Sequence, residues 1–137
     1  MKIFHMDGSL LLELPGYGSL RDADLRGVAL AGANLEGADL YRANMTGALL
    51  EGANLRGAFL HGAYFVDADL RNADLSNTNT CNTDFHGADL RGANFENSYM
   101  QCAHLFQANV TDANFRGATG TIHRVEVPRS WDSVEPI

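Results

Sequence analysis

The sequence is poor in cysteine, in basic residues and in long apolar runs, and each shortage argues against one class of protein. Two cysteines in 137 residues, Cys81 and Cys102, are too few for a disulfide-stapled domain. Ten basic against seventeen acidic residues give a formal net charge of -7, which argues against direct nucleic-acid binding through a basic patch. No apolar run reaches the roughly 18 residues that suggest a membrane-spanning helix.

The N-terminal segment also lacks the features of a secretory signal. Residues Met1 to Gly8 contain neither an apolar core nor a cleavage site, and the run Leu10-Leu11-Leu12 ends at Glu13. The length fits one domain. We therefore expect a soluble, cytoplasmic protein with no membrane contact and with both cysteines reduced.

A period of five residues dominates what the sequence does contain. A large, mostly apolar residue, here called the central residue, occupies every fifth position from Leu20 to Phe115. Such a period advances about 72° per residue, which fits neither a helix nor a strand. The pattern is therefore typical of a repeat architecture.

Each repeat has other recurring positions around the central residue. The residue two places before it is small, usually alanine, and the leading residue, directly before it, is mostly Asp or Asn. The trailing residue follows it directly, and the turn residue after that is usually Gly, Asn or Asp, which tolerate tight turns. Each five-residue repeat has one large and one small inward residue, which predicts that the chain turns a corner in every repeat. Successive coils then pair as short parallel strands about 4.8 Å apart.

This motif resembles that of the pentapeptide-repeat family, Ala-Asp/Asn-Leu-X-X. The segments Ala33 to Gly37, Ala38 to Leu40 and Ala88 to Gly92 match it outright, and the match covers roughly residues 18 to 119. The resemblance implies an all-β fold, a right-handed quadrilateral (four-sided) parallel β-helix with four repeats per coil. About five coils, stacked about 24 Å tall, would accommodate the repeats.

The two ends of the chain fall outside the repeat. Residues 1–17 are predicted to form an N-terminal β-hairpin cap that turns at Asp7-Gly8 and covers the edge of the first coil. Residues 18–119 are predicted to form the β-helix. Residues 120–137 are expected to form a C-terminal strand, over Ile122 to Val127, and a tail.

Four repeats per coil give the solenoid four faces, on each of which residues twenty apart are stacked. The central residues of the first face are Leu20, Leu40, Leu60, Thr80 and Met100; of the second, Leu25, Met45, Phe65, Phe85 and Leu105; of the third, Leu30, Leu50, Leu70, Leu90 and Val110; of the fourth, Leu35, Leu55, Leu75, Phe95 and Phe115. This register predicts that Phe65 stacks on Phe85, and Phe95 on Phe115.

The outward residues differ between the faces. The third and fourth faces alternate acids with arginines, as a solvated surface with weak ion pairs does. The first and second faces carry apolar, aromatic and histidine side chains, among them Cys81. The candidate interaction surface on them consists of Tyr41, Phe59, His61, Tyr64, Val66, His86, Tyr99, His104 and Phe106. Three alternatives stay open: the tail or coil-edge packing covers these rings, they are ordinary isolated surface aromatics, or they form a dimer contact.

The histidines suggest a search for metal or catalytic sites. In the stacked register His61 lies beside Cys81, and His104 lies beside Asp84. Each pair supplies two ligands where zinc needs three or four, and no serine or cysteine completes a catalytic triad. We therefore expect no catalytic residue, no cofactor and no metal, and interpret both pairs as surface polar residues.

The repeat decays between Thr78 and Thr83, where Thr78, Thr80 and Thr83 put hydroxyl groups at inward positions. Buried hydroxyls need hydrogen-bond partners. A polar network, a buried water or a bulge would each satisfy the pattern. The simplest interpretation is that the hydroxyls bond to the backbone or to one another.

These observations favour a non-enzymatic scaffold that presents a surface to an unidentified protein partner, or that self-associates into a dimer. The resemblance implies an alternative, because some pentapeptide-repeat proteins look like DNA in size, shape and charge and bind DNA gyrase. A DNA mimic that modulates gyrase or another topoisomerase fits the net charge of -7. Interleaved arginines such as Arg56 and Arg71, and the small number of coils, count against it.

Overall fold

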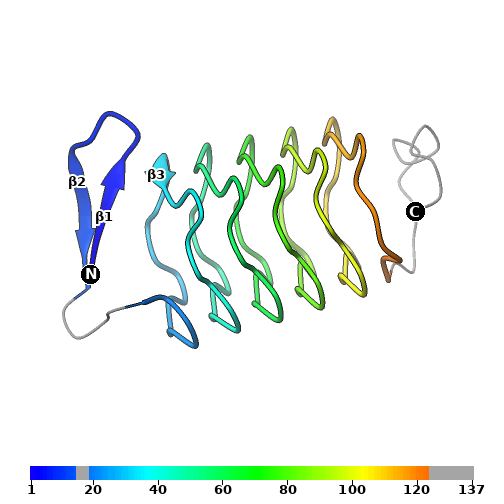
Figure 1. Ribbon diagram of the computed structural model, residues 1–137, viewed down its shortest axis with the longest axis horizontal. Helices are drawn as coiled ribbons and strands as arrows, with labels where there is room; N and C mark the ends of the chain where they lie inside the picture. The colour runs from blue at the N-terminus through cyan, green and yellow to red at the C-terminus, as the bar shows by residue number, and fades with distance from the viewer. Residues whose placement is uncertain (15–18, 124–137) are drawn as a thin grey trace.

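A right-handed, four-sided β-helix forms the body of the molecule, as the repeat predicts (Figure 1). The computed structural model describes residues 1–14 and 19–123. The named strands are β1 (Lys2–His5), β2 (Leu10–Glu13) and β3 (Ala33–Asn34). Within the described residues, no helix is long and apolar enough to span a bilayer.

Parallel pairing between leading residues twenty apart holds the coils together. Asn44 pairs with Asp24 below it and with Tyr64 above it, and the same step recurs on all four faces. The amide N–H of Asn44 donates to the Ala23 carbonyl at 2.9 Å, and the amide of Leu25 donates to the Asn44 carbonyl at 2.8 Å. The predicted register of four repeats per coil is confirmed.

The corner of each repeat is a tight turn with a left-handed residue. Every turn residue from Asp22 to Gly117 has a positive φ, as the frequency of Gly, Asn and Asp there predicts. Arg42, Cys102 and Gln107 adopt the same conformation, with φ between 55° and 58°, although their side chains are not suited to it. The packing of the repeat therefore holds even these residues in the left-handed backbone conformation of the corner.

The leading Asp or Asn has a structural role that the sequence analysis did not assign. Its side-chain oxygen accepts a hydrogen bond from the amide of the trailing residue, as in Asn54 to Arg56 at 3.0 Å and Asp74 to Ser76 at 2.9 Å. This Asx turn satisfies an N–H group at the corner. A leading residue without such an oxygen leaves that bond unmade.

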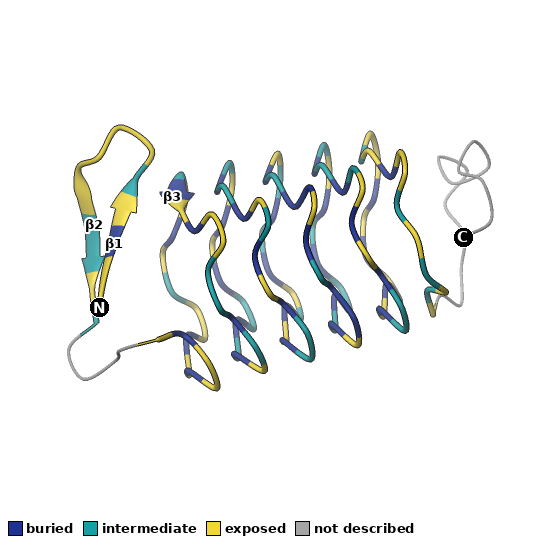
Figure 2. Cartoon of the chain, in the orientation of Figure 1, coloured by how far each residue is buried: buried dark blue, intermediate teal, exposed yellow. Residues whose placement is uncertain are grey.

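The core is a narrow column of central and small residues along the axis (Figure 2). Phe65 stacks on Phe85 with ring centroids 5.5 Å apart, and Phe95 stacks on Phe115 at 5.1 Å, so both predicted stacks are confirmed. Phe85 also meets Phe95 edge to face at 5.6 Å. The later coils therefore have a continuous aromatic centre.

The irregular threonine segment keeps the regular register and does not bulge. The Thr78 hydroxyl donates to the Leu75 carbonyl at 2.7 Å, and the Thr83 hydroxyl donates to the Leu60 carbonyl at 2.8 Å. The Thr80 hydroxyl donates to the Tyr99 carbonyl at 3.0 Å. The interpretation that these hydroxyls bond to the backbone is confirmed.

The predicted hairpin covers the first coil. Strands β1 and β2 pair antiparallel around Asp7-Gly8, with a register shift between Ile3 and Phe4. Strand β1 also pairs antiparallel with β3, which belongs to the fourth face. Ile3 is buried against the core, so the hairpin closes the end of the apolar column.

The repeat register ends at the C-terminal side with a shortened step. Thr119 still pairs with Tyr99, twenty residues earlier, but His123 pairs with His104, only nineteen residues earlier. Of the C-terminal strand expected over residues 122–127, only the first two residues are described. The tail beyond residue 123 and the joint at residues 15–18 lie outside the described part of the chain.

Candidate interaction surface

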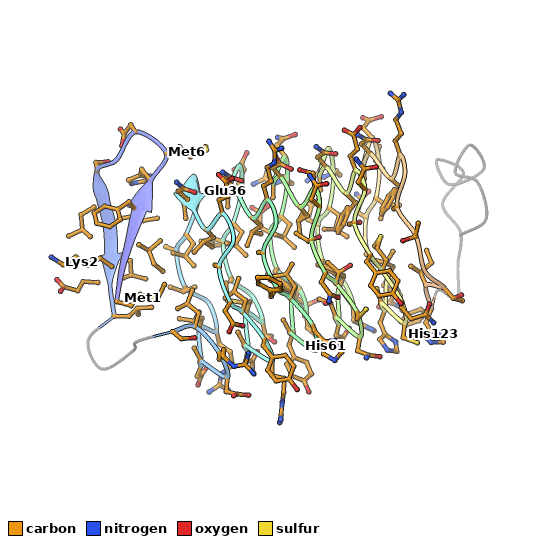
Figure 3. All side chains as sticks on the ribbon, viewed as in Figure 1. Met1, Lys2, Met6, Glu36, His61 and His123 are labelled. Carbon is orange, nitrogen blue, oxygen red and sulfur yellow. The ribbon has the colours of Figure 1, made fainter. Side chains whose placement is uncertain are left out.

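The candidate interaction surface lies along two adjoining sides of the solenoid. All nine of its predicted residues occupy leading or trailing positions of the first and second faces. Phe59, Tyr64, Tyr99 and His104 are exposed, whereas the other five are half-buried. His61 lies on the side of the solenoid away from Glu36, which belongs to the fourth face (Figure 3).

Large apolar side chains replace the Asx residue at several leading positions. Phe59, Tyr64 and Tyr99 are 57%, 49% and 48% exposed. None of them has a side-chain oxygen placed to accept the corner N–H that Asn54 or Asp74 accepts. These residues therefore add neither to the core nor to the turns, which sets them apart from the rest of the repeat.

On the first face, three trailing side chains form a stack parallel to the solenoid axis. The Arg21 guanidinium lies 4.4 Å from the centroid of the Tyr41 ring, and His61 stacks on Tyr41 with ring centroids 5.6 Å apart. Arg21 also donates a hydrogen bond to Asp39 Oδ2 at 3.0 Å. The ion pair and the ring contacts fix the orientation of this stack.

A hollow of about 430 Å³ lies between this stack and the neighbouring column of leading residues. It is lined by Arg21, Asp39, Tyr41, Phe59, His61 and Asn79. Asn79 uses Oδ1 to accept the Cys81 amide N–H at 3.1 Å. Its side-chain NH₂ group has no hydrogen-bond partner among the described residues. The hollow, here called the first-face groove, thus combines aromatic walls with a free donor.

The formal charges of the first face cancel. Arg21 pairs with Asp39, and Arg42 lies 3.5 Å from Asp22. By contrast, Asp67 and Asp84 on the second face have no basic nitrogen within 4.0 Å in the described parts of the chain. The surface is therefore a neutral aromatic strip beside two unpaired carboxylates.

Histidines and aromatic rings also stack on the second face. His86 contacts Phe106 with ring centroids 5.1 Å apart, and His104 stacks on His123 at the same separation. Asp84 and His104 are neighbours in the parallel ladder, as the register predicts. No group of three or more potential metal ligands occurs within residues 1–14 and 19–123.

The prediction that Cys81 is exposed is wrong. Only 7% of its surface is accessible, because it lies in the trailing column between His61 and Gln101. Burial raises the pKa of the Cys81 thiol. Cys81 and Cys102 are both free thiols, and Cys102 is half-buried.

The third and fourth faces are mainly polar, but the sequence analysis missed one apolar residue there. Leu49, a leading residue of the third face, is 49% exposed. Above it, Arg71 makes contacts with Glu51 at 3.1 Å and with Asp69 at 2.7 Å. The fourth face holds a smaller polar hollow of about 300 Å³, lined by residues such as Arg56, Asp74 and Glu96. Leu49 could have been found as the one large apolar residue at a leading position of these two faces.

Comparison with known proteins gives a consistent result. The family model described as pentapeptide repeats (8 copies) matches residues 19–57, 43–79 and 63–101. A solved pentapeptide repeat protein from the Arabidopsis thaliana thylakoid lumen is 33% identical, with a TM-score of 0.58, covering 76% of this chain and 70% of that one. No curated protein sequence matches the chain.

Two further solved structures are more distant. The pentapeptide repeat protein Rfr23 from the cyanobacterium Cyanothece 51142 is 26% identical, with a TM-score of 0.39, covering 75% of this chain and 87% of that one. QnrB1, a plasmid-mediated fluoroquinolone resistance protein, is 17% identical, with a TM-score of 0.39, covering 85% of this chain and 62% of that one.

Proposed function

The chain belongs to the pentapeptide-repeat family, and from this premise we propose that it is a non-enzymatic scaffold whose first and second faces bind a protein partner. The observation that carries the proposal is the replacement of Asx residues by exposed rings at Phe59, Tyr64 and Tyr99. Each replacement forgoes a hydrogen bond worth about 1 kcal/mol to the fold. Exposed aromatic side chains that weaken the turns of the isolated chain are typical of a surface that is buried against another protein.

The solenoid suits this role because it holds side chains in fixed columns. The backbone of Tyr64 is held at both of its polar groups by the preceding coil: its N–H donates to the Ala43 carbonyl at 2.9 Å, and its carbonyl accepts the Met45 N–H at 2.7 Å. Rings on such a frame lose little conformational freedom when a partner binds. A rigid aromatic surface therefore supports recognition without a conformational change.

We propose no catalytic role for the titratable groups of these faces. His104 neighbours Asp84 and His123, and His61 lies next to the buried Cys81. A histidine next to a carboxylate supplies part of a catalytic constellation, but a nucleophile must also lie within hydrogen-bond reach. The raised pKa of the Cys81 thiol works against its serving as that nucleophile.

A cross-linking pull-down tests the scaffold proposal. The double variant Tyr64→Ala/Phe106→Ala removes two rings from the second face, and Arg56→Ala on the fourth face serves as the control. We expect the double variant to lose the proteins that the wild type and the control retain. Light scattering on the same three proteins shows whether the partner is a second copy of the chain. If neither assembly nor capture depends on the two rings, the scaffold proposal is wrong.

The alternative function is that of a DNA mimic acting on gyrase. The net charge of -7 and the unpaired Asp67 and Asp84 favour it. Against it, Arg26 and Arg91 neutralise adjacent acids through contacts of 2.7 Å and 2.6 Å. A DNA supercoiling assay separates the two functions, because a scaffold for another partner leaves gyrase unaffected at micromolar protein. Inhibition or protection of gyrase in that range would favour the mimic.

A further inference from the structure

We propose that the first-face groove binds a proline-rich segment of the partner protein, in the polyproline II conformation and flanked by basic residues. This inference rests on the scaffold function proposed above and specifies the chemistry of the partner. Four features of the groove and of the leading column that continues beyond it support the inference: the spacing of two rings, the opposite wall, a free amide donor and the distribution of charge.

The first feature is the spacing between Phe59 and Tyr99. Both are leading residues of the first face, and the ladder runs from Phe59 through Asn79, which both line the hollow, to Tyr99, one coil beyond it. Two steps of the inter-strand spacing separate the rings by about 9.6 Å. A polyproline II helix repeats after three residues of about 3.1 Å each, or about 9.3 Å. Successive turns of such a segment along the solenoid axis therefore meet successive rings.

The second feature is the opposite wall of the groove. Tyr41 and His61 form a stack across the hollow from Phe59, and Arg21 extends it by one more coil. Grooves lined by aromatic side chains are the common binding sites for polyproline II segments, because the preformed helix loses little entropy on binding. A hollow of about 430 Å³ provides room for the rings of a proline pair.

The third feature is the amide of Asn79, between the two rings. Its Oδ1 accepts the Cys81 N–H at 3.1 Å, which leaves the NH₂ group as the free end. A polyproline II segment has no internal hydrogen bonds, so its carbonyl groups are available as acceptors. Asn79 lies midway between Phe59 and Tyr99, about 4.8 Å along the axis from each. Its amide can therefore donate a hydrogen bond to a backbone carbonyl of the bound peptide between the two rings.

The charges define the flanks of the segment. The groove itself is neutral because Arg21 and Asp39 pair, so it fits an uncharged core such as proline. Asp67 and Asp84 on the adjoining face offer carboxylates without a cation in the described structure, and they complement lysine or arginine beside the prolines. A second copy of the chain fits less well, because its sequence has only three prolines and no two of them are adjacent.

Fluorescence anisotropy with a labelled peptide tests this proposal. The probe is about twelve residues of mainly proline with lysines at both ends, long enough to span several polyproline II turns. The control peptide keeps the lysines but replaces the prolines with serine and glycine. We expect the proline peptide to bind and the flexible peptide to bind at least tenfold more weakly.

Variants locate the binding site. Phe59→Ala and Tyr99→Ala are each expected to weaken binding about tenfold, as loss of an aromatic anchor does. Leu49→Ala is the matched control, because Leu49 is an equally exposed leading residue on the third face. Thermal unfolding checks that each variant remains folded.

The variant Asn79→Asp tests the amide separately. It keeps the oxygen that accepts the Cys81 N–H but removes the NH₂ donor. The peptide for this variant contains only proline and no lysine, so that the new carboxylate at position 79 has no cation to attract. We expect its binding to weaken about tenfold.

Two further variants test the carboxylates of the second face. With the lysine-flanked peptide, Asp67→Asn and Asp84→Asn should each weaken binding a few-fold and reduce its salt dependence.

Several results would overturn the inference: equal binding of both peptides, no binding at millimolar peptide, or an equal loss with Leu49→Ala. Sedimentation as a dimer that Phe59→Ala dissociates would instead identify the occupant as a second copy. If the peptide fails but the Tyr64→Ala/Phe106→Ala variant still loses captured protein, only the proline-rich partner is wrong. If both fail, the scaffold function is wrong as well.

Discussion

Phe95 and Phe115 lie face to face in the core, with ring centroids 5.1 Å apart and ring planes within 5° of parallel. Phe95 also contacts Phe85 with the two ring planes perpendicular, so it joins two aromatic contacts in the later coils. The stability of this end of the solenoid should therefore depend strongly on one side chain.

Phe95→Ala is expected to lower the free energy of unfolding by about 3–5 kcal/mol, because it leaves a cavity in a packed column. Urea denaturation followed by circular dichroism measures the change. Phe59→Ala serves as the control: its ring is 57% exposed, so the loss should stay within about 0.5 kcal/mol. Similar losses in the two variants would contradict the assignment of Phe95 to the core and Phe59 to the surface.

Restoring the Asx residue at an aromatic leading position should stabilise the fold. Phe59→Asn and Leu49→Asn each add an acceptor for the trailing amide, of the kind that Asn54 provides at 3.0 Å. We expect a gain of about 0.5–1 kcal/mol in each case. Thermal or urea unfolding measures it, with Asn54→Leu as the reverse change. A clear loss of stability in Phe59→Asn would mean that the ring serves the fold, and the argument for an interaction surface would lose its basis.

The turn positions predict a difference between two glycines. At Gly52 a Cβ atom would meet nothing within 4 Å, whereas at Gly87 it would clash with Asp67 Oδ1. Both residues have positive φ, so Gly52→Ala should cost about 1 kcal/mol for the conformation alone. Gly87→Ala should cost more, and the added substitution Asp67→Gly should recover the difference. A double-mutant cycle by chemical denaturation measures the coupling.

Acid should remove the stabilising contribution of the ion pairs on the third face. Hydrogen bonds from Arg71 and Arg91 lower the pKa of Asp69 and Asp89 below the usual 3.8. Their contribution is therefore complete above about pH 5 and is lost as the pH falls through the lowered values. Arg91→Met should lower Tm at neutral pH, and the difference from wild type should shrink as the pH falls below about 4. Arg116→Met is the control, since Arg116 makes no ion pair with any described residue. A gap that stays constant with pH would contradict the assignment.

The two thiols should differ in reactivity. The thiolate is the reactive form, and burial raises the pKa of Cys81, whereas Cys102 is half-buried at a corner. A thiol reagent should therefore modify Cys102 first. The variants Cys81→Ser and Cys102→Ser each leave one thiol, which assigns the two rates. Faster modification of the thiol in Cys102→Ser would mean that Cys81 is more accessible than its position indicates.

The fold could be predicted from the sequence because the repeat encodes it redundantly. The inward positions and the corners recur in every repeat, so an isolated irregular residue such as Thr80 does not change the register. The same redundancy fixed which residues are stacked, and the pairs Phe65–Phe85 and Phe95–Phe115 lie where the twenty-residue step puts them.

The surface was less predictable, because exposure depends on neighbours in adjacent coils. Cys81 occupies the same trailing position as Tyr41, yet it is buried between longer side chains of the same column. The first-face groove likewise depends on side-chain orientation, since Arg21 must turn toward Asp39 and Tyr41 to form its wall. The role of leading Asp and Asn residues as hydrogen-bond acceptors was also missed, although the side-chain chemistry of the Asx turn could have suggested it.

The twenty-residue coil has a consequence for how this protein can change length. Insertion or loss of a whole coil would preserve every column, because each side chain would still lie above its former neighbours on the same face. Loss of a single five-residue repeat between Phe59 and Tyr99 would turn everything after it by a quarter of a revolution. Tyr99 would then leave the face of Phe59, and the exposed column of leading residues would lose its second ring while the core stayed intact. Viable variants of this solenoid should therefore differ in length by multiples of four repeats wherever the surface matters.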